Sequence, residues 1–452
     1  MSLPVSIKHK YGREAFASKL QKICLIVSLQ QPIYLSRNFP YERAKRIADE
    51  ASLMDRYFDY GLCHKLYLEN SKQIFTPLFT GLLEVAEATA KTPNPFKFSV
   101  AASGLFIEQV IKEDAFLLSI IKKLLGLGAL EFVAVPYHNS LASLYSGGLD
   151  EFEEQVKEDV NLLGKIFSVQ PKVLANTKLL FNDKIARSAE AMGFVGIFVD
   201  GVKGLNAESS AFTYTSSAAP SLRLLVRDTA VSTALVSGAV EEIDRLKNGD
   251  GLGVIYLDID ELGKRDKTYF KLIAGTLHEQ GFSFTMPTEY VLDTTPAGSL
   301  SVPEPLTIAT EESGGNVNRF LANAMQRISY DRVSALKPFI KEVGDERVKV
   351  LWRILQQLDH FVCMGEKLPP AYHKIFSSPA ETFSVYNTIL VDFEGKVTTI
   401  VQRMRKARGP AAPKPGMPPA GYRTPAQMLD RGSPAPLGGP VPNPYDKKAL
   451  SF

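Results

Sequence analysis

Short apolar segments of strand length recur through the first 290 residues of this chain. Many of the intervals between them have apolar residues at helical spacing, as over 150–167, 183–192, 230–246 and 269–280. Buried strands that alternate with helices predict parallel βα units, in which helices cover the sheet. Seven or eight such units favour a closed barrel, although periodicity alone leaves an open sheet as an alternative. The predicted strands are 24–29, 98–101, 130–135, 172–175, 194–199, 222–226, 254–257 and 282–285.

The pattern changes after residue 305. Long stretches with helical spacing at 317–336, 345–364 and 380–405 predict a helical subdomain. The last 44 residues hold 11 of the 28 prolines, a composition that buries too little apolar surface to fold alone. We therefore expect three parts, with a barrel in residues 1–305, the helical subdomain in 306–408 and a disordered proline- and glycine-rich tail in 409–452.

Composition narrows the class of protein. Hydrophobic residues make up 45% and charged residues 22%, which is typical of a soluble globular protein. The formal net charge of +3 gives no electrostatic case for nucleic acid or an acidic membrane as the partner. Three cysteines without a CxxC pair argue against a disulfide framework or a cysteine zinc site. With no secretory signal and no membrane span in the sequence, a cytoplasmic location is expected.

Candidate chemistry follows the predicted strands, because barrel enzymes place their active groups at the carboxyl ends of the strands. Polar residues stand directly after the first, third, fourth and seventh of them. These segments begin with Gln30 and Gln31, with Tyr137, His138 and Asn139, with Asn176, Thr177 and Lys178, and with Asp258, Ile259, Asp260 and Glu261.

In order and spacing, these segments resemble the markers of glycoside hydrolase family 57, which includes α-amylases, 4-α-glucanotransferases and amylopullulanases. The matches are Gln30-Gln31-Pro32 for His-Gln-Pro, Tyr137 to Ala142 for Tyr-His-His-Ser-Leu-Ala, Asn176 to Leu179 for Asn-Thr-Glu-Leu, and Leu257 to Gly263 for Met-Asp-Tyr-Glu-Thr-Phe-Gly. Phe320 to Gln326 and Trp352 to Phe361 resemble two later segments of the family. The resemblance covers roughly residues 23 to 405 and implies an incomplete, TIM-like (β/α)7-type barrel followed by an α-helical subdomain.

The resemblance also implies roles for individual residues. Asp258 stands at the position of the family's catalytic acid, whereas Lys178 replaces the nucleophilic glutamate. A lysine ammonium has no free lone pair with which to attack a sugar, and its charge opposes an oxocarbenium-like transition state. We therefore expect Lys178 and Asp258 to form an ion pair, and the protein to be inactive as a retaining glycosidase.

Substrate contacts implied by the family fall on Gln30, Gln31, His138, Asn139 and Phe320, with an α-glucan or maltooligosaccharide as the ligand. His138 is equally explained as a hydrogen-bonded histidine in a polar barrel mouth, and His360 as a residue that orients helices. Asp258 and Asp260 would share one face of a strand, but no histidine pair accompanies them, so no metal and no cofactor is expected. Glu261 is expected to be a solvated loop residue.

Three functions stay open. The chain is an α-glucan-binding or regulatory pseudoenzyme, a carbohydrate-active enzyme of altered mechanism, or a scaffold that presents its tail to a protein partner. The prolines of residues 409–452 would dock in aromatic grooves of that partner.

Overall fold

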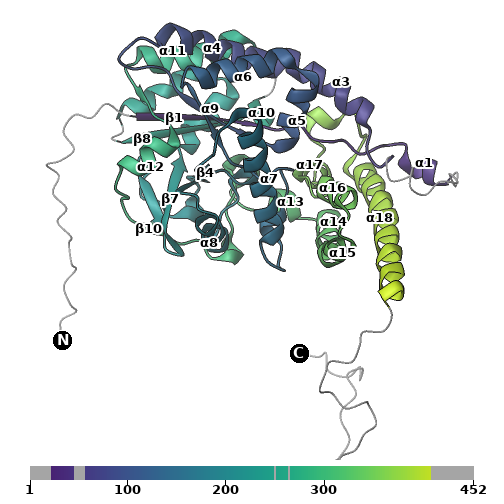
Figure 1. The fold of residues 1–452 in the computed structure, drawn as a ribbon. Coiled ribbons are helices and arrows are strands. Elements are labelled where there is room, and N and C mark those ends of the chain that lie inside the picture. The colour runs from purple at the N-terminus through teal and green to yellow at the C-terminus, as the bar shows by residue number, and fades with distance from the viewer. Residues whose placement is uncertain (1–21, 45–55, 249–250, 263–264, 409–452) are drawn as a thin grey trace, which may run out of the picture. The chain divides into compact units, whose positions relative to one another are not determined.

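The computed structural model describes residues 22–44, 56–248, 251–262 and 265–408 (Figure 1). Met1–Val401 form one compact unit. Gln402–Phe452 form a second, of which the structure describes only 402–408, the end of the last helix. The tail expected at 409–452 lies outside the described residues.

Seven parallel strands carry the fold within the described residues. Strand β1 (Lys22–Leu29) lies between β2 (Phe98–Ala102) and β8 (Leu252–Asp258), and β3 (Leu130–Val133) continues the sheet beyond β2. The other three of the seven are β4 (Val173–Leu174), β5 (Gly196–Asp200) and β7 (Ala219–Arg227). Three further short strands are β6 (Thr213–Ser216), which is antiparallel to β7, β9 (Ser283–Phe284), which pairs with β1, and β10 (Ser299–Leu300), which pairs with β6.

Two sets of backbone contacts close these strands into a ring. A parallel bridge between Ala134 and Leu174 joins the ends of β3 and β4, supported by a hydrogen bond from Ala175 N to Ala134 O of 2.9 Å. On the other side, Asp228 N donates to Val254 O at 2.8 Å and joins β7 to β8. The order β1-β2-β3-β4-β5-β7-β8 is therefore a (β/α)7-type barrel, as expected, and not an open sheet.

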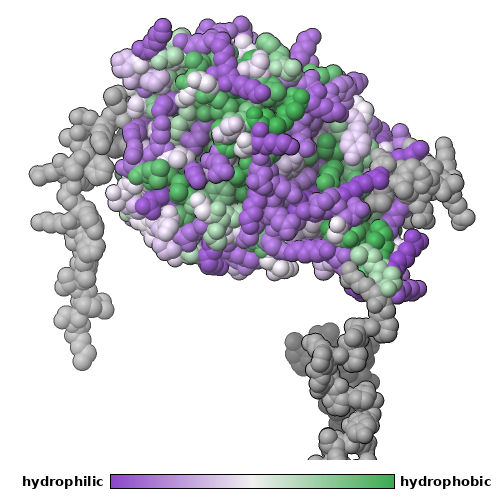
Figure 2. All heavy atoms as spheres, viewed as in Figure 1, coloured by the Kyte–Doolittle hydropathy of each residue, from purple (hydrophilic) through white to green (hydrophobic). Residues whose placement is uncertain are grey.

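Helices cover the outside of this ring, and α4, α6 and α11 lie together over one part of it (Figure 1). On the face shown in Figure 2, α7 presents a run of hydrophilic residues to solvent. The helices of this part are α1 (Phe39–Ala44), α3 (Tyr60–Asn70), α4 (Thr76–Thr89), α5 (Gly104–Glu113), α6 (Ala115–Gly126), α7 (Asp150–Phe167), α8 (Asp183–Ala191), α9 (Thr229–Ser237), α10 (Ile259–Leu262), α11 (Lys267–Glu279) and α12 (Pro287–Asp293). A helical region follows, with α13 (Asn318–Leu321), α14 (Ala324–Ala335), α15 (Lys337–Val343), α16 (Glu346–Ile354), α17 (Leu358–Cys363) and α18 (Pro379–Arg408).

Local sequence explains where many helices begin. A short polar side chain precedes the first turn and accepts a hydrogen bond from a backbone N–H that has no partner within the helix. The residues that do this are Asp59 for α3, Ser103 for α5, Asp114 for α6, Asn182 for α8, Asp228 for α9 and Asp266 for α11.

Some predicted helices are broken. The helix expected at 230–246 ends at Gly238, whose φ of 102° is left-handed, and a 3-10 helix follows. The helix expected at 317–336 is interrupted because Asn323 and Gln326 form a capping box that starts α14. The helix expected at 345–364 likewise divides into α16 and α17. Strands β6 and β10 were not predicted.

Alternation along the strands decides what faces the inside of the barrel. On β1, Cys24 and Ile26 belong to the apolar cluster inside the ring, whereas Ile23, Leu25 and Val27 pack under the helices. On β8, Val254 and Tyr256 likewise face inward. These inward rows lead to Ser28 and Asp258 at the carboxyl ends of the strands, and this end is called the mouth of the barrel below.

Candidate functional site

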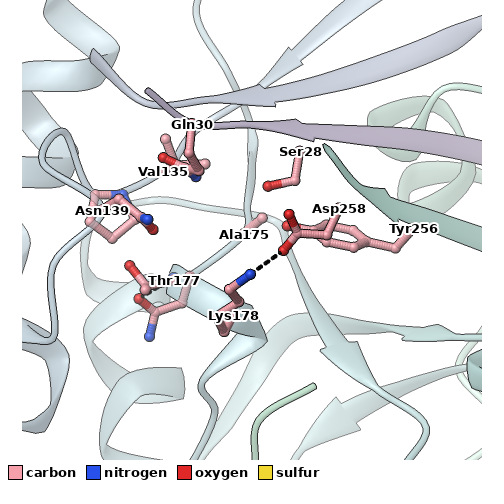
Figure 3. A pocket seen from close by; sticks show the side chains of 11 residues that line it. Ser28, Gln30, Val135, Asn139, Ala175, Thr177, Lys178, Tyr256 and Asp258 are labelled. Atoms are coloured by element: carbon pink, nitrogen blue, oxygen red, sulfur yellow. Dashed lines mark hydrogen bonds and ion pairs between the residues drawn. The ribbon is translucent and has the colours of Figure 1, made fainter. Parts of the chain in front are cut away.

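A small pocket lies at the mouth of the barrel (Figure 3). Its volume is about 280 Å³, part of which is open to solvent. Gln30, Asn139 and Thr177 line one side of it, and Lys178 and Asp258 face each other across another. The pocket therefore brings together residues that follow four of the predicted strands.

Lys178 and Asp258 form the ion pair that the sequence led us to expect. Lys178 Nζ lies 2.7 Å from Asp258 Oδ2, and the two side chains are only 11% and 10% exposed. Burial alone would lower the pKa of Lys178, but the surrounding acidic residues, Asp258 foremost, raise it above its ordinary value. The lysine is therefore a cation that fills the space between the two strand ends.

The backbone around Lys178 is unusual. Lys178 and Leu179 both have left-handed conformations, with φ values of 46° and 52°, and Asn139 on the opposite wall has a φ of 49°. Such conformations cost a non-glycine residue about 1–3 kcal/mol and tend to occur at functional sites. Lys178 O accepts a hydrogen bond from Thr310 N at 3.0 Å, which helps to hold this turn.

Two expectations about the acidic segment after β8 were wrong. Asp258 and Asp260 do not share a strand face, because β8 ends at Asp258 and α10 begins at the next residue. Asp260 N instead donates to Asp258 Oδ1 at 3.1 Å. Glu261 is not a solvated loop residue, since its Oε1 lies 3.7 Å from Lys178 Nζ and 3.4 Å from Arg319 Nη2.

A second pocket of about 150 Å³ shares Gln30 and Asn139 with the first. Gln31 and His138 line only this second pocket, and both are almost completely buried. Burial lowers the pKa of His138 to about 3, with smaller effects from Arg353 and Lys349, so the imidazole is neutral. Phe320 lines neither pocket and is fully buried in the apolar core.

Asp359 is a residue of the second pocket to which the sequence assigned no role. It begins the Asp-His-Phe run at 359–361, so its place in the family resemblance was the signal that pointed to it. Tyr372 Oη donates a hydrogen bond to its carboxylate, and burial raises the pKa of Asp359. His360 next to it bonds to Ile354 O at 3.0 Å through Nε2, within the helical region.

Comparison with known proteins identifies the family to which this chain belongs. The sequence profile of Glycosyl hydrolase family 57 matches residues 24–303, which is more than half of the chain. The chain belongs to glycosyl hydrolase family 57. It is 25% identical over 397 residues to a protein from Methanocaldococcus jannaschii named "Putative alpha-amylase", and the match covers 79% of this chain and 83% of that one.

Solved structures agree on the fold of this family 57 protein. The branching enzyme of Pyrococcus horikoshii superimposes with a TM-score of 0.61 at 10% identity, covering 86% of this chain and 92% of the other. The 4-alpha-glucanotransferase of Thermococcus litoralis gives a TM-score of 0.59 at 13% identity, covering 83% of this chain. The chain spans only 60% of the length of that glucanotransferase.

A buried charge cluster that the sequence did not reveal also lies at strand ends. Asp200 ends β5 and Arg227 ends β7, and Arg227 Nη1 lies 2.6 Å from Asp200 Oδ2 and 2.8 Å from Glu312 Oε2. Arg227 is 1% exposed. Glu312 belongs to the 3-10 turn Glu311–Ser313. In this family 57 protein, that turn therefore supplies a counter-ion.

Two features are absent from the part of the chain that the structure describes. No three His, Cys, Asp or Glu side chains come together there in a way that would hold a metal ion. None of its helices combines the length and the apolar character needed to cross a membrane.

Proposed function

We propose that this family 57 protein is inactive as a retaining glycosidase and serves as an α-glucan-binding or regulatory relative of the family's enzymes. The observation that carries the proposal is the 2.7 Å contact between Lys178 Nζ and Asp258 Oδ2. It occupies the space between the two positions at which the family's chemistry takes place.

Glycoside hydrolysis with retention of the anomeric configuration requires two carboxyl groups about 5–5.5 Å apart. One attacks the anomeric carbon and the other protonates the leaving oxygen. A protonated lysine does neither. The general acid must deliver a proton to the leaving oxygen, whereas Asp258 Oδ2 is held at 2.7 Å by the Lys178 ammonium. The positive charge also opposes the positive charge that develops on the sugar. Both steps of the retaining mechanism, the formation of a covalent glycosyl-enzyme and its hydrolysis, are therefore lost.

An α-glucan is the ligand class that the family favours, since similar proteins are named as an alpha-amylase, a glucanotransferase and a branching enzyme. Gln30, Asn139 and Thr177 would offer hydrogen bonds to its hydroxyl groups. The volume of about 280 Å³ includes open solvent, and the enclosed part of the pocket holds no more than about one water molecule. We therefore place the glucan at the rim of the mouth, outside the enclosed pocket.

The same small volume favours a second candidate function. With Lys178 and Asp258 filling the centre, the barrel would act as a scaffold, and binding would pass to other parts of the chain such as residues 409–452. A carbohydrate-active enzyme of altered mechanism is the remaining alternative, and turnover measurements test it directly.

Hydrolysis and transglycosylation of maltoheptaose by the wild type, Lys178→Glu and Lys172→Glu test the catalytic claim. Lys172 is exposed at the amino end of the same strand, so its variant makes the same charge change away from the mouth. We expect no turnover by any of the three, because Gln30 and Asn139 also depart from the family pattern. Wild-type turnover within the ordinary range of about 1–10³ per second would refute inactivity.

Calorimetry with maltoheptaose separates the two binding proposals. Saturable binding by the wild type that weakens in Asn139→Ala supports an α-glucan-binding mouth. An absence of heat at millimolar ligand would exclude it and leave the scaffold.

A further inference from the structure

Three side chains that line the first pocket carry buried polar atoms without a hydrogen-bond partner. Within the described residues, no group bonds to Gln30 Oε1, Asn139 Nδ2 or Thr177 Oγ1. Figure 3 shows the three side chains on the same side of the pocket. Asn139 and Thr177 are only 7% and 3% exposed, so solvent does not readily replace the missing partners. A buried polar group without a partner destabilises a fold, and three at one opening indicate a place for a ligand.

The backbone fixes two of these side chains at the pocket. Asn139 has a left-handed φ of 49°, and Lys178, which follows Thr177, has one of 46°. Asn139 O accepts a hydrogen bond from Leu358 N at 3.0 Å, and Lys178 O accepts one from Thr310 N at 3.0 Å. Surrounding contacts therefore maintain both strained conformations, as they do at sites that hold functional groups in place.

The size of the pocket limits what these groups bind. Its enclosed part holds about one water molecule, and the rest is open to solvent. A sugar ring does not fit inside, whereas a single hydroxyl group does. Val135, Pro136 and Ala175 add apolar surface to the lining, which suits the carbon that carries an alcohol better than it suits an ion.

The unpaired atoms set the chemistry of the bound group. Asn139 Nδ2 is a donor, Gln30 Oε1 is an acceptor, and the hydroxyl of Thr177 is either. A hydroxyl group donates one hydrogen bond and accepts at its lone pairs, so it satisfies this mixed set. An anion would leave the Gln30 acceptor unpaired. The Lys178 ammonium in the same lining opposes a metal cation.

We infer that this pocket binds the primary hydroxyl group of a glucose unit, while the sugar ring stays at the rim. In an α-1,4-linked glucan, the C6 hydroxyl is carried by a carbon outside the ring, whereas the C2 and C3 hydroxyls are attached to the ring itself. Only the C6 hydroxyl therefore enters without the ring. The inference rests on the proposed α-glucan-binding mouth and names the group of the glucan that the mouth recognises.

Calorimetry on the full-length chain with two matched ligands tests this. They are maltotetraose and its 6-deoxy form, in which hydrogen replaces every C6 hydroxyl while the rings and linkages stay the same. We expect maltotetraose to bind at least about tenfold more tightly, because the 6-deoxy form leaves the three polar atoms of the pocket unpaired.

Thr177→Val locates the recognised hydroxyl group, because it keeps the shape of the side chain and removes only Oγ1. It should weaken binding of maltotetraose about threefold to tenfold and leave the affinity for the 6-deoxy form unchanged. The midpoint of thermal unfolding should not fall, since Oγ1 has no partner in the part of the chain that the structure describes. A merely structural role of Thr177 would change the affinity for both ligands equally.

Thr213→Val is the matched control. Thr213 lies on β6, is 2% exposed and also has an unpartnered Oγ1, but it does not line the pocket. This variant should leave both affinities unchanged. Gln30→Met, at a partly exposed position, removes the acceptor and keeps the test decisive if Thr177→Val does not fold.

The outcomes separate this inference from the proposed function. Equal affinity for the two ligands, or wild-type affinity of Thr177→Val and Gln30→Met for maltotetraose, would overturn the inference and leave the α-glucan proposal standing. Failure of both ligands to bind the wild type would overturn both. A crystal structure of the maltotetraose complex with only a water molecule in the pocket would also overturn the inference.

Discussion

Lys178 and Asp258 are 80 residues apart in the chain, yet their charged groups meet at 2.7 Å. Lys178 follows β4 and Asp258 ends β8, and three steps around the seven-stranded ring separate these strands. Only a closed barrel brings these two strand ends face to face. The contact is therefore a product of ring closure and of the left-handed turn at Lys178.

Removing the cation should destabilise the fold. In Lys178→Met, the nearly buried Asp258 carboxylate loses its counter-ion, and breaking one side of such a pair typically costs about 3–5 kcal/mol. Urea unfolding at neutral pH measures this loss. The double variant Lys178→Met/Asp258→Asn should recover much of it, because the unpaired charge is gone. A single variant as stable as the wild type would mean that the pair is solvated.

Replacing Arg227 should destabilise the fold at least as much as replacing Lys178. Its guanidinium is 1% exposed and bonds to Asp200 and Glu312, so Arg227→Met leaves two carboxylates without a cation and should cost about 3–5 kcal/mol. Arg227→Lys should recover only part of this, because an ammonium does not bond both carboxylates in the same geometry. Arg187→Met, on an exposed arginine of α8, should change the free energy of unfolding by less than about 0.5 kcal/mol.

The raised pKa of Glu131 predicts that the stability of the protein depends on pH. Burial raises its pKa from 4.5 to about 7, while a hydrogen bond from Thr288 Oγ1 to its carboxylate acts in the opposite direction. Between these values the folded protein holds a proton that the unfolded chain has lost, so the free energy of unfolding falls as pH rises through this window.

Glu131→Gln removes this dependence. Above the window it should be more stable than the wild type by up to about 3 kcal/mol, whereas below pH 4.5 the two should be nearly equal. Glu279→Gln, on an exposed glutamate of α11 that is not among the groups acting on the pKa of Glu131, is the control and should keep the wild-type slope over this window. A wild-type stability that rises with pH through the window would contradict the assignment.

The helical region depends on one capping residue. Asn323 accepts a hydrogen bond from Gln326 N at 2.9 Å and donates to Met364 O at 2.7 Å. Asn323→Ala should therefore cost about 1–2 kcal/mol in thermal or urea unfolding. Asn318→Ala, on an exposed residue of α13, makes the same change without these bonds and should be close to neutral.

Much of the fold follows from local pattern. All eight predicted strands are present, because a strand buried on both faces needs a continuous apolar run whatever its neighbours are. Helices α7 and α11 begin and end within two residues of their predicted limits, since their spacing and caps are local. Helix breaks at Gly238 and Asn323 were missed because apolar spacing continues across both.

The sequence by itself determined the family and the charge at position 178, since segment order and residue type are written in the chain. Alternation places neighbouring residues of a strand on opposite faces, but the tertiary structure decided which face is inward, because both faces are apolar. Only the tertiary structure decided that Glu261 and Asp359 join the mouth and that Arg227 lies between Asp200 and Glu312. Such contacts join residues from different strands and loops, and no local pattern records them, because the distances between them are set when the ring closes.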